Sequence, residues 1–379
     1  MSPADISREL PRKRILVAIG TRPEAIKMAP VVLALRQQPW ADVRILATAQ
    51  HRDMLDQVLD AFGLVPDVDL DIMRPGQALP ELTARLLLAL DDVLAKEAPD
   101  AVLAQGDTTT VMTVAMAAFY RRIPLGHVEA GLRTGDLYNP FPEEMNRIVA
   151  GRLARWHFAP TAQARENLLA EGFDAGSIHV TGNTVIDALL QVSGRELPLP
   201  VAIPGDKRLV LVTAHRRENF GEPFRQVCLA IRELADAHPD IHLLYPVHPN
   251  PNVAVPAREM LGGHPRITLC EPLDYLPFVA AMKRATLVLT DSGGVQEEAP
   301  ALAKPVLVMR RETERPEAVA EGVVRLVGPD REAIVAEAGR LLRDPAAYAR
   351  MARGTSPYGD GHAAGRIAAI LRNSLAPGA

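Results

Sequence analysis

DSGGVQEEAP, residues 291–300, follows the apolar run at 287–290 and precedes a helix-forming segment. This order predicts a strand, a glycine turn and a helix N-terminus. In such a turn the backbone amides point outward at the positive end of the helix dipole, and Gly293 and Gly294 carry no Cβ that would keep a ligand away. Glu298 lies further along the helix, where its carboxylate can accept hydrogen bonds from ribose hydroxyls. The stretch predicts a phosphate site, although any α/β protein can use such a turn as a tight connection.

Strand-like runs alternate with amphipathic segments along the chain, which is typical of βαβ units with helices on both faces of a parallel sheet. In the first half the predicted strands are 14–20, 43–49, 101–105, 125–128, 156–159 and 178–180. In the second half they are 209–213, 241–245, 267–269, 287–290, 305–309 and 323–327. The pattern therefore predicts an α/β protein of two Rossmann-like, doubly wound domains.

The segment SGRELPLPVAIPG, which begins at residue 193, contains three prolines and two glycines and has the composition of a linker. We expect an N-terminal domain over 1–192, a linker over 193–207 and a C-terminal domain over 208–362, which contains the predicted phosphate site. A last helix, within 363–379, can pack back on the N-terminal domain.

Composition excludes several classes of protein. The net charge of -4 shows no basic excess, so we expect no nucleic-acid partner. Two cysteines without a CxxC motif argue against a disulfide scaffold or a Cys-rich metal site. No apolar run approaches the roughly 18 residues of a membrane span, and the first residues have no apolar signal-peptide core. We expect a cytoplasmic protein with no membrane partner.

Several sequence motifs are missing as well. There is no GxGxxG after the first predicted strand, no GxxxxGK[ST], no GxSxG and no HExxH. These absences weigh against a nicotinamide cofactor, a P-loop, a nucleophile elbow and a zinc site. We therefore expect no cofactor and no metal, and the chemistry must rely on carboxylates, histidines and arginines.

The first predicted strand leads into GTRPEAIKMAP, residues 20–30. Arg22 and Lys27 supply positive charge near a helix start, which suits either an anion site or a solvated, capped turn. Pro30 should kink or end a helix that begins this early.

Carboxylates gather at the next strand ends. Asp107, in QGDTTT, is either a helix N-cap or an exposed catalytic group. The stretches HVEAGLRTGD and PFPEEMNR add four carboxylates, at Glu129, Asp136, Glu143 and Glu144. Glu129 directly follows an apolar strand, which favours a functional role. Glu143 and Arg147 are spaced i and i+4 on a predicted helix, so a surface ion pair is the alternative.

The second half places basic and aromatic residues after its strands. His215 and Arg216, in HRRENFGEP, form either an ordinary polar strand end or a proton donor beside phosphate-binding charge. His248 and Arg315 follow other strands. Phe278 offers a flat surface for a base, or else it is a core aromatic.

These stretches resemble the motifs of the non-hydrolysing UDP-N-acetylglucosamine 2-epimerases, in the family's order and over nearly the whole chain. The matching stretches are GTRPEAIKMAP, TAQHRDMLDQVL, GDTTT, HVEAGLRTGD, PEEMNR, TGNTVIDAL, HRRENFGEP, YPVHPNP and DSGGVQEEAP. The resemblance implies a glycosyltransferase-B-like pair of domains facing a central cleft, a homodimer, and interconversion of UDP-GlcNAc and UDP-ManNAc without nicotinamide.

The resemblance also implies roles for individual residues. The uridine diphosphate contacts would be Arg22, Lys27, His248, Phe278, Ser292, Gly293, Gly294, Glu298 and Arg315. The catalytic set would be Asp107, Glu129, Glu143, Arg147 and His215. Some members bind a second UDP-GlcNAc as an activator, and the matching effector residues would be Gln50, Gln77 and Arg216. Gly76 stands where those members have an arginine, so this part of the pattern is incomplete.

The chemistry of epimerisation at C2 agrees with this set of catalytic residues. The C2 proton of an acetamido sugar is not next to a carbonyl, so epimerisation requires either transient oxidation or elimination of UDP across C1 and C2. Oxidation needs a dinucleotide whose fingerprint is missing, whereas elimination needs charge stabilisation and acid and base groups. The resemblance implies 2-acetamidoglucal as the intermediate. We assign Asp107 as one base and Glu129 with Glu143 as the other acid/base group, and His215 would protonate or hydrogen-bond the leaving phosphate.

Three other functions fit parts of the pattern. A hydrolysing epimerase would release ManNAc and UDP. A glycosyltransferase-B-type UDP-sugar transferase would share the DSGG turn and Glu298 but would not need the carboxylate-rich first domain. A nucleotide-sugar-binding regulatory module would bind UDP without turnover.

Overall fold

A computed structural model of the chain describes residues 12–48, 52–72, 74 and 76–377. The chain forms two compact units. Unit 1 comprises Met1–Ala188 and Gly361–Ala379, and unit 2 comprises Leu189–Asp360.

Unit 1 is built on a parallel sheet. In its described part the strand order is β3-β2-β1-β4-β5-β6-β7. The strands are β1 (Lys13–Ile19), β2 (Ala41–Ala47), β3 (Val68–Asp69), β4 (Ala101–Gln105), β5 (Leu125–Val128), β6 (Trp156–Ala159) and β7 (Ile178–Val180). In β1 the residues from Ile15 to Ile19 are at most 1% exposed. Such a continuous apolar run is expected for a parallel strand covered on both faces.

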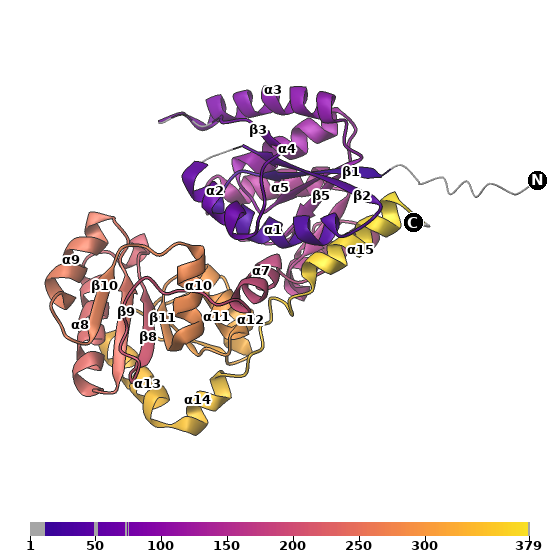
Figure 1. The fold of residues 1–379 in the computed structure, drawn as a ribbon. Coiled ribbons are helices and arrows are strands. Elements are labelled where there is room, and N and C mark those ends of the chain that lie inside the picture. The colour runs from indigo at the N-terminus through magenta and orange to yellow at the C-terminus, as the bar shows by residue number, and fades with distance from the viewer. Residues whose placement is uncertain (1–11, 49–51, 73, 75, 378–379) are drawn as a thin grey trace, which may run out of the picture. The chain divides into compact units, whose positions relative to one another are not determined.

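Helices cover both faces of this sheet (Figure 1). They are α1 (Arg22–Arg36), α2 (Arg52–Ala61), α3 (Leu79–Glu97), α4 (Thr109–Tyr120), α5 (Glu143–Leu153), α6 (Ala162–Ala170), the short η1 (Ala175–Ser177), α7 (Thr184–Ser193) and α15 (Ala363–Leu375). Leucines of α3 and the apolar residues of α4 pack on one face of β1 and β4. The last helix, α15, lies beside α1 (Figure 1), and its first turn is tied to α7 because Ala364 N donates to Asp187 Oδ1 at 2.8 Å.

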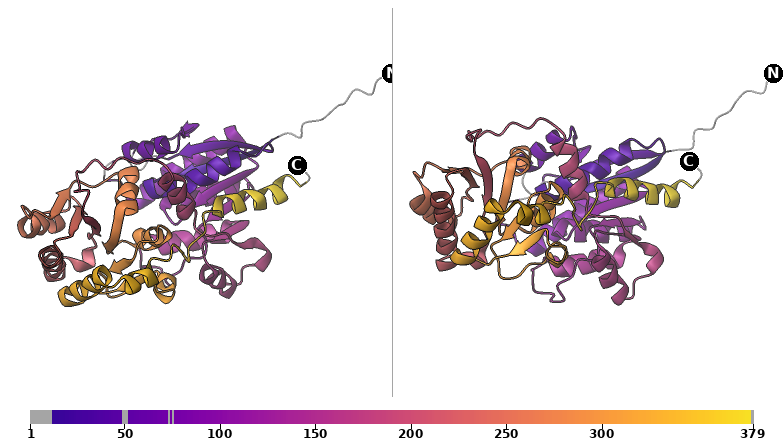
Figure 2. Two further views of the ribbon diagram at one scale, coloured as in Figure 1. Left: turned by 60° about the horizontal axis from the view of Figure 1, so that its bottom comes forward. Right: turned by 90° about the horizontal axis from the view of Figure 1, so that it is seen from below.

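Unit 2 repeats the architecture with the strand order β10-β9-β8-β11-β12-β13, all parallel. The strands are β8 (Arg208–Thr213), β9 (Ile241–Pro246), β10 (Ile267–Cys270), β11 (Ala285–Thr290), β12 (Val306–Val308) and β13 (Val324–Leu326). The helices are the short η2 (Arg217–Asn219), α8 (Glu222–Ala237), α9 (Pro251–Leu261), α10 (Tyr275–Arg284), α11 (Gly293–Ala301), α12 (Pro316–Ala320), α13 (Arg331–Arg343) and α14 (Pro345–Met351). The core of one sheet face comes from α8, α9, α13 and α14, and α10 and α11 contact the sheet as well (Figure 2).

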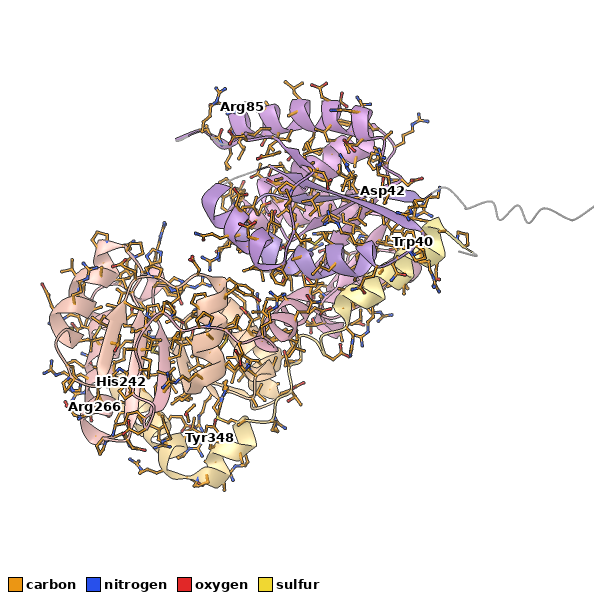
Figure 3. All side chains as sticks on the ribbon, viewed as in Figure 1. Trp40, Asp42, Arg85, His242, Arg266 and Tyr348 are labelled. Carbon is orange, nitrogen blue, oxygen red and sulfur yellow. The ribbon has the colours of Figure 1, made fainter. Side chains whose placement is uncertain are left out.

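Polar contacts fasten the strands of unit 2 to their surroundings. His242 on β9 lies 2.8 Å from Thr268 Oγ1 on β10, through its Nε2 (Figure 3). Arg266 donates from Nε to the carbonyl of Ala235 at 2.8 Å. Tyr348 of α14 donates from its hydroxyl to a carbonyl of β11 at 3.1 Å (Figure 3). These contacts hold the strands in register, so that the polar loops after the strands have a fixed base.

The predicted α/β class and all twelve predicted strands are confirmed, with ends that differ by at most two residues. The final residue of the predicted strand 43–49 lies outside the described residues. β3 was not predicted because its two residues have no apolar run. The last helix is confirmed at Ala363–Leu375.

Of the two expectations for Pro30, a kink or the end of its helix, the second was wrong, because α1 continues to Arg36. Pro30 lacks the N–H of one intrahelical bond, but it lies among buried neighbours on both sides, from Met28 to Val32. Tertiary packing therefore holds the helix together across the missing bond.

The segment predicted as a linker lies entirely in unit 2. Lys283 Nζ donates to Ser193 O at 2.6 Å, and Arg284 Nη2 donates to the carbonyls of Ile203 and Pro204 at 3.1 and 3.0 Å. The division between the units falls within α7, between Ala188 and Leu189. Within the described residues, no helix has the length and apolar character needed to cross a membrane.

Candidate active site

Glu129 is the central residue of a polar cluster in unit 1. It follows β5 with φ of 63°, a left-handed conformation that is rare for a residue other than glycine. Lys27 Nζ contacts its two carboxylate oxygens at 2.6 and 2.7 Å, and Asn183 Nδ2 donates to Oε1 at 2.9 Å. Gln105 donates to Oε2. Both oxygens are thus acceptors, as in an ionised carboxylate, and strands β4 and β5, helix α1 and the loop before α7 meet at this one group.

Asp107 lies in the neighbouring loop, after β4. The N-cap of α4 is Thr108, whose Oγ1 accepts from Val111 N at 3.3 Å, so the N-cap alternative for Asp107 was wrong. Asp107 instead pairs with Arg147, whose side chain is 11% exposed. Burial raises the pKa of Asp107, and the charge of Arg147 opposes this effect. A carboxyl with a raised pKa takes up a proton more readily than an exposed aspartate does.

Arg147 also contacts Glu144 Oε2 at 3.2 Å, and the alternative of a surface ion pair between Glu143 and Arg147 is not found among the described residues. Glu144 is 1% exposed because it faces the preceding loop and accepts from Thr134 N at 3.0 Å. Glu143 is half-buried in the first turn of α5, and we find no partner for it among the described side chains.

Glu24 is a buried carboxyl that the sequence interpretation missed. It accepts from Gly20 N at 2.5 Å and from Thr108 Oγ1 at 2.7 Å, and it completes a capping box with Thr21. Burial raises the pKa of Glu24 to about 7, against these hydrogen bonds. Glu24 therefore joins the loop after β1 to the loop that carries Asp107. The T-x-x-E spacing after a strand is the signal that would have found it.

Arg22 stands at the start of α1, half-buried, and has no ion-pair partner among the described residues. It is therefore available to an anion, unlike Lys27, whose ammonium is already engaged by Glu129.

The DSGG turn organises a second polar cluster, in unit 2. Asp291 is fully buried and accepts from the backbone N–H groups of His215 and Arg216, both at 2.8 Å. Ser292 is the N-cap of α11 without a side-chain cap, and Gly293 and Gly294 form the first helical residues. The predicted strand, glycine turn and helix are confirmed.

Arg216 adds positive charge to this helix N-terminus. Its Nε donates to Asp291 O at 3.2 Å, and its Nη2 lies 3.7 Å from where a Cβ on Gly293 would be. On the other side, Glu298 Oε1 lies 3.5 Å from the corresponding position on Gly294. A guanidinium and a helix N-terminus side by side make an anion-binding corner with a carboxylate near its edge.

The remaining predicted residues of unit 2 lie on neighbouring loops. His215 and His248 stack with ring centroids 5.5 Å apart. Phe278 is half-buried in the first turn of α10 rather than fully buried in the core. Arg315 is the N-cap residue of α12, and its Nε pairs with the buried carboxylate of Glu297.

The predicted effector residues are distributed over both units. Gln50 lies outside the described residues. Gln77, in unit 1, accepts from Arg85 Nη1 at 2.9 Å (Figure 3), whereas Arg216 belongs to the DSGG corner of unit 2. Among the described residues, no group of three His, Cys, Asp or Glu side chains is placed to hold a metal ion.

Comparisons with known proteins identify the family. The family model for UDP-N-acetylglucosamine 2-epimerase matches residues 33–372. The chain is 54% identical over 371 residues to the UDP-N-acetylglucosamine 2-epimerase of Escherichia coli K12, covering 95% of this chain and 99% of that one. It is 50% identical over 355 residues to the Bacillus subtilis enzyme of the same name, covering 93% of both.

Solved structures agree. The crystal structure of the Neisseria meningitidis UDP-GlcNAc 2-epimerase bound to UDP-GlcNAc matches with a TM-score of 0.85 and 46% identity, covering 94% of this chain and 99% of that one. A glycosyltransferase of kitacinnamycin, 14% identical with a TM-score of 0.66 and covering 97% and 100%, shares the fold alone. The fold and site thus define an isomerase of the glycosyltransferase-B-like α/β class. The chain belongs to the UDP-N-acetylglucosamine 2-epimerase family.

Proposed function

We propose that the chain reversibly converts UDP-GlcNAc to UDP-ManNAc by eliminating UDP and adding it back, through 2-acetamidoglucal. The observation that carries this proposal is Asp107, a largely buried carboxyl with a raised pKa that faces Arg147 and lies in the field of Glu129 and Lys27. This is an environment for moving a proton, and it occurs in a chain without a dinucleotide fingerprint. The Neisseria meningitidis relative bound to UDP-GlcNAc supports the substrate, as does the Methanocaldococcus jannaschii relative, 34% identical, solved with UDP-GlcNAc and UDP.

The reaction needs two kinds of group. A base removes the proton from C2, the C2–H electron pair becomes the C1=C2 double bond, and the C1–O pair leaves with the β-phosphate of UDP. Addition from the other face of C2 reverses these steps with inverted configuration. The carboxylates of unit 1 suit the proton transfers, and the DSGG corner with Arg216 suits the charge that develops on UDP.

The geometry refines the roles within unit 1. Glu129 is occupied by Lys27, Gln105 and Asn183, so we propose that it positions Lys27 and supplies negative potential. Asp107 and Glu143 are then the two groups that exchange protons with C2. Arg22, Ser292, Gly293, Glu298 and Arg315 remain our proposed contacts to uridine diphosphate, together with His248 and Phe278.

An isotope experiment tests the route. UDP-GlcNAc with oxygen-18 in the bridge between C1 and phosphorus should scramble the label into non-bridging positions, because UDP leaves and returns. Turnover in deuterated water should place deuterium at C2. Epimerisation that leaves all of the label in the bridge would exclude C1–O cleavage and with it the elimination. Free ManNAc as the product would identify a hydrolysing epimerase, and transfer to an added acceptor would identify a glycosyltransferase.

We also propose a cytoplasmic homodimer. The cysteines, Cys228 and Cys270, are free thiols, as a reducing compartment requires. Three large apolar side chains on α3 and α4 are more than half exposed, at Leu88, Phe119 and Tyr120. Such a patch is expected at an interface between subunits. Sedimentation of the wild type and of Leu88→Glu would test it, with a monomeric wild type as the contradicting result.

A further inference from the structure

The carboxylate of Asp291 has a side-chain donor in addition to two backbone donors. Besides His215 N and Arg216 N, its Oδ2 faces Asn219 Nδ2 at 3.4 Å, and Asn219 is itself held by Met309 O at 3.1 Å. All of these contacts are made by one carboxylate oxygen. The carboxylate is 0% exposed, so its second oxygen is cut off from bulk water.

That second oxygen, Oδ1, has no hydrogen-bond donor among the described residues. A buried carboxylate oxygen without a donor is costly. His215 Nδ1 lies 3.6 Å away, which is an electrostatic contact rather than a hydrogen bond. A small rotation of the half-buried imidazole would bring an Nδ1–H group to Oδ1 and satisfy it.

The stacked partner of His215 is committed to a different arrangement. His248 Nδ1 accepts from Asn250 N at 3.1 Å, so its neutral ring carries the proton on Nε2. The rings are nearly parallel, with an interplanar angle of 13°. The two histidines therefore differ at Nδ1: that of His248 accepts a hydrogen bond, whereas that of His215 faces a carboxylate oxygen.

We propose that Asp291 is a positioning residue that holds His215 as the Nδ1–H tautomer, leaving Nε2 to exchange a proton with the β-phosphate oxygen of the departing UDP. The role of His215 in this statement rests on the proposed function. Asp291 would act through His215 and through the fixed N–H groups of the turn, without touching the sugar. The same carboxylate thus anchors the turn and orients the proton-carrying ring.

Three charged or titratable groups face His215. Burial lowers the pKa of His215, the charge of Asp291 raises it, and His248 and Arg216 lower it further. The Asp291 carboxylate is the one opposing influence among these, so removing its charge should lower the pKa of His215 further. An anionic phosphate arriving at Nε2 would act in the same direction as Asp291 and promote protonation of the ring where it is used.

Nitrogen-15 NMR of histidine-labelled protein without nucleotide tests the proposal. The His215 signals are assigned by their loss in His215→Gln. In the wild type the neutral ring should be protonated on Nδ1, and a neutral Nε2–H tautomer would overturn the proposal whatever any variant does. In Asp291→Asn the pKa of His215 should fall and the tautomers should mix. An unchanged pKa and tautomer in a folded Asp291→Asn would also refute the proposal.

Tyr245→Phe is the matched control. Tyr245 is fully buried and donates from its hydroxyl to Ala214 O at 2.7 Å, in the residue just before His215. Its loss removes a hydrogen bond from the same strand end but no charge, so the His215 tautomer should stay as in the wild type. A tautomer change in Tyr245→Phe equal to that in Asp291→Asn would reduce Asp291 to a structural role.

Kinetics separate this inference from the proposed function. Asp291→Asn should lower kcat more than it raises KM and should move the His215 limb of the pH profile, as the NMR shift predicts. If the oxygen-18 label scrambles but the tautomer is wrong, the elimination stands and the Asp291 inference fails. If the tautomer is right but the label stays in the bridge, the inference about orientation stands and the leaving-group role fails.

Discussion

The polar clusters of the two units each contain a buried carboxylate directly after a parallel strand, and this carboxylate has different hydrogen-bond donors in the two units. Glu129 of unit 1 is held by side chains, namely Lys27, Gln105 and Asn183. Asp291 of unit 2 is held mainly by the backbone N–H groups of His215 and Arg216. In unit 1 the donors are an ammonium and two amides on side chains, which can move. In unit 2 the donors are backbone N–H groups, and these fix the shape of a loop.

The difference matches what each half must do. Proton transfer at carbon needs carboxyl groups whose pKa is adjusted by neighbours, and unit 1 gathers such groups around Asp107. Binding a diphosphate needs N–H groups and cations in fixed positions, and unit 2 provides a helix N-terminus with Arg216 beside it. On the proposed function, one fold class used twice supports a reactive role in unit 1 and a recognition role in unit 2.

The largest effect should come from Asp107→Asn. The substitution keeps the size of the side chain but removes the group that we propose as a base, so kcat should fall by roughly 10²- to 10⁴-fold with little change in UDP binding. Asp136→Asn is the control, because Asp136 is exposed and bonds only Tyr138 N through that side chain. Steady-state turnover checks both, and near-normal turnover in Asp107→Asn would remove it from the mechanism.

A second, smaller effect concerns stability. Glu129→Gln leaves the ammonium of Lys27, 18% exposed, without its carboxylate, and breaking such a partly buried pair costs about 3 to 5 kcal/mol. Urea unfolding should show this loss. Asp91→Asn, which breaks the exposed pair with Arg121 in the same unit, should unfold like the wild type. Equal stability of the two variants would mean that Glu129 contributes no more to the free energy of unfolding than a surface residue does.

These contrasts also show what sequence can and cannot predict. Strands and the polar loops after them were predictable, because buried parallel strands read as apolar runs and their carboxyl ends share one edge of the sheet. The hydrogen bond from Asn183 to Glu129 was not predictable, because 54 positions in the sequence and two strands separate the two residues. Which of the adjacent residues Glu143 and Glu144 faces inward depends on the entry of the chain into α5, and spacing alone left open a Glu143–Arg147 ion pair where the structure has Arg147 with Glu144.

The pH dependence of unit 1 should depend on Glu24. Its pKa is about 7 in the folded chain and near 4.5 when unfolded, so between these values the folded state binds more protons. The contribution of Glu24 to stability therefore falls as pH rises from about 4.5 to about 7 and is constant above, with a slope of at most about 1.4 kcal/mol per pH unit.

Glu24→Gln imitates the protonated form and has no such titration. The difference in unfolding free energy between wild type and variant should shift in favour of the variant across this window, as measured by urea unfolding from about pH 5 to about pH 8. A difference that is flat with pH would show that Glu24 is ionised throughout and that its hydrogen bonds outweigh its burial.

The smallest predicted effect is on recognition in unit 2. Arg315→Ala should weaken UDP binding by roughly tenfold, as expected for the loss of one charge-assisted contact, without a comparable fall in kcat. Because Arg315 also neutralises the buried Glu297, the variant loses stability for a separate reason. Glu297→Gln with Arg315→Ala removes the buried charge that Arg315 neutralised and should restore stability but not affinity. Arg311→Ala, at an exposed position on the same loop, should bind UDP like the wild type. Calorimetry measures the UDP affinity of each variant. Recovery of affinity in the double variant would mean that Arg315 supports the loop and does not touch the ligand.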